Sequence, residues 1–254
     1  MQVTLPLPDA VRFIAMEAKA ETVRAPARPP IADVLREGIR QGLLAPGQPL
    51  IQASIAEAMG VSRIPVREAL HALASEGLVT FGDDGGARVT ELSPDEIDEL
   101  WTLRALIESH MAPAITRNAG PDDVARLRAL VDSMDGVDHD TWSGRNFAFH
   151  QDLHALSGMP HVADVAERVL TMIEPYSRIA VSTLDAQGEA QAEHVAMIDA
   201  IAAGDGEALA GLLLHHSNRA RQALLAHLGA QQPERDQRIV ATEAARSLAD
   251  RLAG

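Results

Sequence analysis

The chain has 254 residues, 46% of them hydrophobic and 23% charged, which suits one or two folded domains and excludes a disordered chain. It has no cysteine, which excludes disulfides, thiol nucleophiles and thiolate metal sites. With 22 basic residues against 36 acidic ones, the net charge is −14, and this balance by itself argues against a nucleic-acid partner. No segment is as long and apolar as a membrane span, so we expect a soluble cytoplasmic protein without a membrane partner.

Residues 1–29 are predicted to form an N-terminal arm and linker, with a short helix over 10–21. Paired prolines at 29 and 30 end any helix that precedes them. The next segment, residues 30–92, has a different pattern. Its spacing predicts a helix from Ile31 to about Gly42, a second over 51–59, a third from Ser62 to about Glu76, and a β-hairpin with a glycine turn over 77–90. Three helices followed by a hairpin predict a winged helix-turn-helix domain.

The second and third of these helices carry the helix-turn-helix pattern. Gly60 allows the tight turn between them, and Val66 and Leu70 form part of the inward stripe of the third helix. Arg63 and Arg67 lie on another face, in the turns of a recognition helix that reach base edges. An arginine fork matches guanine O6 and N7 and also binds phosphate. The alternative is an ordinary helical hairpin whose arginines are only solvated.

The stretch Gly60-Val61-Ser62-Arg63-Ile64-Pro65-Val66-Arg67-Glu68-Ala69-Leu70 resembles the signature of the GntR family of bacterial transcriptional regulators. The similarity extends without a gap over about 60 residues. It implies DNA contacts at recognition-helix, first-helix and wing positions: Arg36, Ser62, Arg63, Pro65, Arg67, and Gly85 or Gly86. The start of the second helix, residues 51–54, is more apolar and less acidic than is usual in the family.

Residues 93–230 are predicted to form an all-helical bundle. Ser93 begins it as a helix N-cap, with Pro94 at the first helical position, and only helical periodicity follows, in six or seven segments. Residues 231–254 form a polar C-terminal tail with a helix over 242–252. The fold class is therefore mostly α, with the hairpin wing as its only predicted sheet.

Ten histidines are many for this length, and three of them fall on separate helical runs of the bundle. Asn146 and His150 are four residues apart and share a helical face, while His194 and His216 lie on later helices. Three imidazoles and one oxygen ligand could hold a divalent metal that keeps open positions. The alternative is a set of unrelated histidines, each hydrogen-bonded or exposed in its own surroundings.

The bundle is also similar to the FCD ligand-binding domain of FadR-like GntR proteins. This resemblance implies a metal on Asn146, His150, His194 and His216, with zinc or nickel suited to three imidazoles. Asn146 stands where aspartate is commoner, and the adjacent His215 leaves the last ligand uncertain by one residue. The resemblance implies a small carboxylate effector on the metal, with Arg104 and Asn218 as its partners and Arg145, Arg168 and Arg178 as weaker candidates.

These features predict a homodimeric, ligand-responsive repressor that binds a pseudo-palindromic operator in double-stranded DNA and is released by its effector. Two other classes remain open at this point. A metal-dependent hydrolase would use the same histidines, with Asp152 or Glu108 as base. A protein-interaction scaffold would keep the winged fold but tolerate the loss of Arg63 and Arg67.

Overall fold

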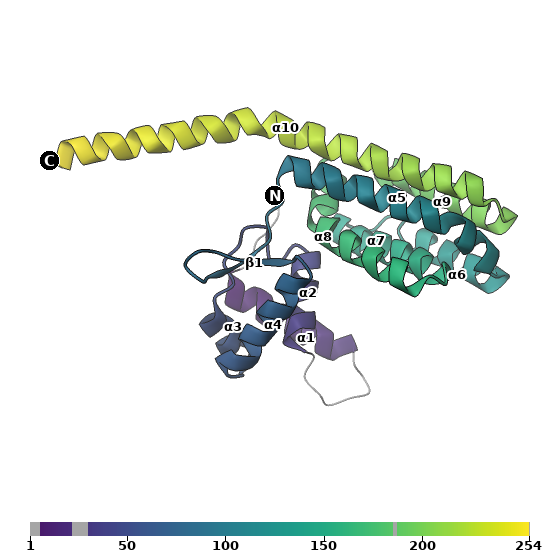
Figure 1. Cartoon of the computed structure of the whole chain (residues 1–254), viewed down its shortest axis with the longest axis horizontal. Helices are drawn as coiled ribbons and strands as arrows, with labels where there is room; N and C mark the ends of the chain where they lie inside the picture. Colours follow the sequence, from purple (N-terminus) through teal and green to yellow (C-terminus); the bar gives the residue numbers. More distant parts are fainter. Residues whose placement is uncertain (1–5, 22–29, 185–186, 254) are drawn as a thin grey trace.

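The computed structural model describes the backbone of residues 6–21, 30–184 and 187–253, and the side chains of 6–16, 30–181 and 187–229. The chain forms a small N-terminal domain of helices and one hairpin beside a longer helical bundle (Figure 1). The predicted fold class is confirmed. Among the described residues, no helix is both long and apolar enough to cross a membrane.

The N-terminal domain contains the predicted winged helix-turn-helix. Gly60 ends one helix in the left-handed conformation, with φ of 62°, and so makes the tight turn before the next. The hairpin pairs Val79 with Val89, and both side chains point into the core. Leu35 and Leu70 are fully buried in the same core. The elements are α2 (Ile31–Arg40), α3 (Gln52–Met59), α4 (Arg63–Ser75), β1 (Val79–Phe81) and β2 (Ala87–Val89).

A further helix, α1 (Leu7–Glu21), packs into this core, although residues 1–29 were expected to be an arm and linker. Val11 and Ile14 on its inner face are buried against α2 and α3. Ile14 takes the place of a side chain at Gly38, where a Cβ would lie 2.4 Å from the Ile14 Cδ1 atom. The helix itself was predicted, but its apolar face was not identified as part of the winged domain.

The bundle consists of six helices within the described residues: α5 (Pro94–Asn118), α6 (Pro121–Asp132), α7 (His139–Leu156), α8 (Pro160–Leu184), α9 (Gln187–Ala203) and α10 (Gly206–Ala253). Ser93 starts α5 with a full capping box, in which its side chain accepts from the Glu96 N–H and its own N–H donates to the Glu96 carboxylate. The backbone of 231–253 continues α10 beyond the bundle, where a separate helix over 242–252 was predicted (Figure 1).

Helix α8 joins the two domains. The Tyr176 hydroxyl accepts a hydrogen bond from the Leu92 N–H at 2.7 Å, and Arg168 donates to the Ser75 carbonyl at 2.6 Å. Met172 packs against the core of the winged domain. From the other side, the Arg40 guanidinium of α2 lies 4.8 Å from the centre of the Phe147 ring on α7. The N-terminal domain is therefore seated directly on two helices of the bundle.

Glu174 lies fully buried on α8 near this boundary, and neither carboxyl oxygen has a hydrogen-bond partner among the described residues. Burial raises its pKa to about 8, against the opposing charges of Arg178, Arg40 and Arg104, while Glu37 adds to the rise. The folded protein therefore holds a neutral carboxyl that ionises in the unfolded chain near its ordinary pKa.

We expect this difference to make stability fall as pH rises from about 4.5 to about 8, by up to about 1.4 kcal/mol per pH unit, because the unfolded state binds fewer protons there. Glu174→Gln removes the titration and flattens this part of the curve. Urea unfolding of both proteins at intervals from pH 5 to 8.5 measures the difference in slope. Parallel curves for the two proteins would contradict the expectation.

Candidate DNA-binding surface and metal centre

The start of α4 presents the predicted recognition residues to solvent. Arg63 and Arg67 are exposed, and neither forms an ion pair with a described residue. Ser62 occupies the N-cap position without making a side-chain cap hydrogen bond, so its hydroxyl is available to a phosphate. Pro65 sits in the first helical turn, where its missing N–H breaks no helical hydrogen bond. This end of α4 is built to meet an anionic partner.

The wing ends in the predicted glycine turn. Gly85 has φ of 72° and open space around its Cα, so its backbone can approach another molecule closely. The Gly86 N–H, in contrast, donates to the Asp84 carboxylate at 2.9 Å. That aspartate therefore shapes the turn. The wing is held to α4 by the stacked rings of His71 and Phe81, whose centres are 4.7 Å apart.

Arg36 lies in different surroundings from Arg63 and Arg67. Its guanidinium donates to both oxygens of Glu76, at 2.8 and 2.7 Å, and also pairs with Asp33. It lines a space between the winged domain and α8, opposite Arg168. Arg36 can contact a DNA phosphate only if its ion pairs with Glu76 and Asp33 break. A role of Arg36 in DNA binding therefore stays a prediction.

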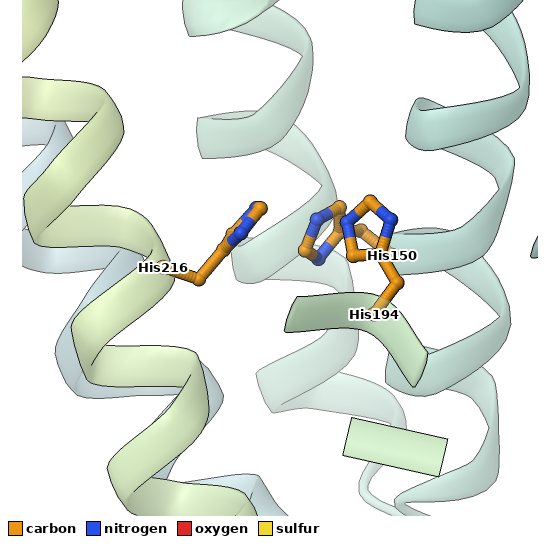
Figure 2. Close-up of side chains that lie close together, drawn as sticks. All are labelled: His150, His194 and His216. Carbon is orange, nitrogen blue, oxygen red and sulfur yellow. The ribbon is translucent and has the colours of Figure 1, made fainter. Parts of the chain in front are cut away.

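Three of the predicted ligands meet in the bundle. Figure 2 shows the rings of His150, His194 and His216 pointing toward one another from α7, α9 and α10. One nitrogen of each lies within 4.8 Å of the others, and all three rings are buried. Among the described residues, the ring nitrogens of His194 have no hydrogen-bond partner, and those of His150 have none besides the Glu108 carboxylate, which lies close to Nδ1. Burial lowers the pKa of His150 to about 3, which keeps the ring in the neutral form that binds a metal.

A glutamate carboxylate lies close to the Nδ1 atom of two of the three rings. The Glu193 Oε2 atom is 2.6 Å from His216 Nδ1, and the Glu108 Oε1 atom is 3.2 Å from His150 Nδ1. Such carboxylates orient a ligating imidazole and leave its Nε2 atom for the metal. Glu193 was not predicted, because its partner His216 lies 23 residues away on another helix.

Asn146 is the predicted oxygen ligand of the set. It lies one turn before His150, is buried, and its Oδ1 atom has no hydrogen-bond partner among the described residues. The register of the last ligand is also clear, because His216 is buried and the His215 side chain is 68% exposed. Three imidazoles and an amide oxygen, with no hydrogen-bond partner among the described residues at the His194 ring or at Asn146 Oδ1, fit a divalent metal such as zinc or nickel.

A cavity beside the histidines contains one of the two predicted effector residues. Arg104 lines it, is buried, and donates from Nε to Glu108 at 3.1 Å, while its Nη2 atom has no hydrogen-bond partner among the described residues. Asn218 is half-buried and is not among the described lining residues; its neighbour Arg219 is. Arg219 was not predicted as an effector residue. Helical periodicity does not tell whether position 218 or position 219 faces a cavity when both are partly exposed.

The two candidate bases of a hydrolase are poorly placed. Asp152 is partly exposed and pairs with Arg126 at 3.3 Å, outside the histidine cluster. Glu108 is buried and shared among Arg104, His150 and His154, and these groups hold its pKa well below its usual range. A carboxylate fixed in this way orients its neighbours and is a poor proton acceptor.

Comparison with known proteins matches two parts of the chain to protein families. Residues 29–89 match the bacterial regulatory proteins of the gntR family, and residues 99–230 match the FCD domain. An HTH-type transcriptional regulator of Streptomyces ambofaciens is 31% identical over 67% of this chain and 73% of its own length. The HTH-type transcriptional repressor GlaR of Escherichia coli is 24% identical over 72% of this chain and 88% of its own length. The solved structure of E. coli McbR/YncC has a TM-score of 0.70 and 22% identity, and the match covers 78% of this chain and 96% of that one.

An exposed recognition helix, a wing and a helical domain with a buried pocket define a DNA-binding transcriptional regulator rather than an enzyme. The chain belongs to the GntR family and carries a C-terminal FCD domain. The comparisons do not support the hydrolase alternative.

Proposed function

We propose that this regulator is a homodimeric repressor that acts on DNA in the cytoplasm. A small carboxylate, bound at a metal in the FCD domain, releases it from its operator. Two recognition helices related by a two-fold axis would read a pseudo-palindrome with half-sites about one DNA turn apart. A relative that carries the name repressor supports the sign of regulation. Arg63 and Arg67 would read bases, and Ser62 and Gly85 would contact the backbone.

The observation that carries the effector role is the position of Arg104. Arg104 lines the same cavity as Asn146 and His216, two of the candidate metal ligands, and its Nη2 atom has no hydrogen-bond partner among the described residues. A bound metal would supply open positions to carboxylate oxygens, and Arg104 would add an opposite charge in a buried setting. Asn218, which lies outside this lining, stays a weaker candidate than Arg219.

A route from the pocket to the DNA-binding domain is short. Asn146 is followed directly by Phe147, and the Arg40 guanidinium of α2 packs over the Phe147 ring. A shift of α7 on effector binding would therefore move the surface of the bundle against which the winged domain packs. The effector would act by favouring one arrangement of the two winged domains over another.

The test is a footprint of the zinc-loaded protein on DNA from upstream of its own gene or on sites selected from random DNA. We expect two protected half-sites about one helical turn apart, a dimer in sedimentation, and at least tenfold weaker binding when millimolar acetate is added. A single half-site bound by a monomer would contradict the dimeric model. DNA binding that acetate and other carboxylates leave unchanged would contradict the effector role.

A further inference from the structure

The cavity beside the histidines changes in chemistry along its length. At the level of His216 its walls are polar, with Asn146 on α7 and Arg104 on α5. Further along α10 the wall consists of Ala220 and Ala223. Ala223 lies seven residues after His216, which is about 10 Å along a helix. The cavity is therefore long enough for a polar head and a separate apolar body.

The other helices place apolar side chains at the same end. Trp142 lies one turn before Asn146 on α7, and Ala190 lies one turn before His194 on α9. Because α9 and α10 are consecutive and antiparallel, the N-terminal direction on α9 matches the C-terminal direction on α10. Helix α8 adds Ala180 to the same wall. The apolar residues thus form one continuous compartment beyond the histidines.

This compartment offers few partners to a polar ligand group. Its remaining polar lining residues are Ser177 and Arg219, and the Arg219 guanidinium already donates to both oxygens of Glu193, at 2.7 and 2.9 Å. A ligand hydroxyl placed among the alanines would lose water without gaining a hydrogen bond, which is unfavourable. An apolar group would lose no hydrogen bond there, and the alanine side chains that line this part are small.

The cavity also has a direction. Asn146 and His216 at its polar end are buried, while Val181, Ala220 and Ala223 at its apolar end are partly exposed, between α8 and α10. A ligand entering from solvent therefore passes the apolar walls before it reaches the polar end.

We propose that the effector is a monocarboxylate with an aryl or branched-alkyl body, and not a polyhydroxy sugar acid. Its carboxylate enters first and lies beside Asn146, Arg104 and the metal, while its body occupies the compartment lined by Trp142 and the alanines. This assignment rests on the proposed effector function and narrows the class of ligand.

The test is calorimetric titration of the zinc-loaded dimer with three probes: acetate, phenylacetate, and arabinonate, a sugar acid of size similar to phenylacetate. We expect phenylacetate to bind at least tenfold more tightly than either acetate or arabinonate, because only phenylacetate fills both ends of the cavity. Equal or tighter binding of arabinonate would overturn the inference and leave the carboxylate effector in place. Failure of all three probes to bind would overturn the proposed effector site itself.

A pair of variants locates the apolar body. Ala223→Leu fills the compartment and is expected to weaken phenylacetate binding at least tenfold without changing zinc content or acetate binding. Ala226→Leu, an exposed position on the same helix, is the matched control and is expected to bind all probes as the wild type does. Ala220→Val provides the same readout if the leucine variant does not fold. Unchanged phenylacetate affinity in a folded Ala223→Leu or Ala220→Val protein would overturn the inference.

Discussion

Replacing both Arg63 and Arg67 by alanine is expected to weaken operator binding by about 30-fold or more, since each base-reading arginine contributes roughly 1–3 kcal/mol. Both side chains are exposed at the start of α4 and form no ion pair with a described residue, so their loss leaves the folded domain intact. A gel-shift titration on the footprinted fragment measures the change. Thermal unfolding of the variant is expected to match the wild type within about 1 °C, because surface substitutions of this kind are nearly neutral.

The matched control is Arg117→Ala, which removes an exposed arginine from α5 in the bundle. It removes one positive charge, where the double variant removes two, and it lies outside the winged domain. We expect wild-type affinity for this protein. An Arg117→Ala protein as weak as the recognition-helix variant would show that bulk charge, and not placement, governs binding. A recognition-helix variant that still binds as the wild type does would show that Arg63 and Arg67 do not read the operator, whereas a wild type that gives no shift on any DNA would favour the scaffold alternative.

The placement of charge explains why a protein of net charge −14 can bind DNA. Residues 31–92 contain five arginines and eight acidic residues, so even the winged domain is formally acidic. Three of these acidic residues form ion pairs within the domain: Glu76 and Asp33 pair with Arg36, and Glu37 pairs with Arg40. Arg63 and Arg67 are left to the solvent. We therefore expect weak non-specific DNA affinity and a modest dependence on salt.

Local patterns were enough to predict the winged domain and the helical class of the bundle. Gly60, the Ser93 cap and the glycine turn of the wing each act through their own backbone, so the sequence predicts them without tertiary information. The histidine set was harder, because its members lie on three helices and only the fold brings them together. Its identification depended on the family resemblance.

Features that depend on packing between distant segments escaped prediction. The apolar stripe of α1 did not show which domain it would join, since a stripe on a helix indicates a buried face but not the partner that buries it. Nor did the sequence show that Arg36 would be held by Glu76, forty residues away, or that Glu193 would orient His216. Each of these contacts is set by tertiary geometry, on which residue spacing within a helix has no bearing.

Metal binding is expected to stabilise the wild type and to be lost in His216→Ala. Metal in excess of its dissociation constant by about 1,000-fold stabilises a folded protein by roughly 4 kcal/mol, which for a chain of this size corresponds to about 8 °C or more in the unfolding midpoint. His216→Ala removes one of three imidazoles and the ring that Glu193 orients. We expect its unfolding midpoint to respond little to zinc or to a chelator, and its zinc content to fall well below one per chain.

His215→Ala provides a control one residue away on the same helix. Its ring is largely exposed and lies outside the buried cluster, so zinc content and the zinc-dependent rise in midpoint are expected to match the wild type. The comparison is made within each protein, between chelator-treated and zinc-loaded samples, so a change in metal-free stability does not affect it. If His215→Ala loses zinc while His216→Ala keeps it, the assignment of the last ligand is wrong. If both keep it, the metal lies elsewhere and the buried histidines serve only in packing.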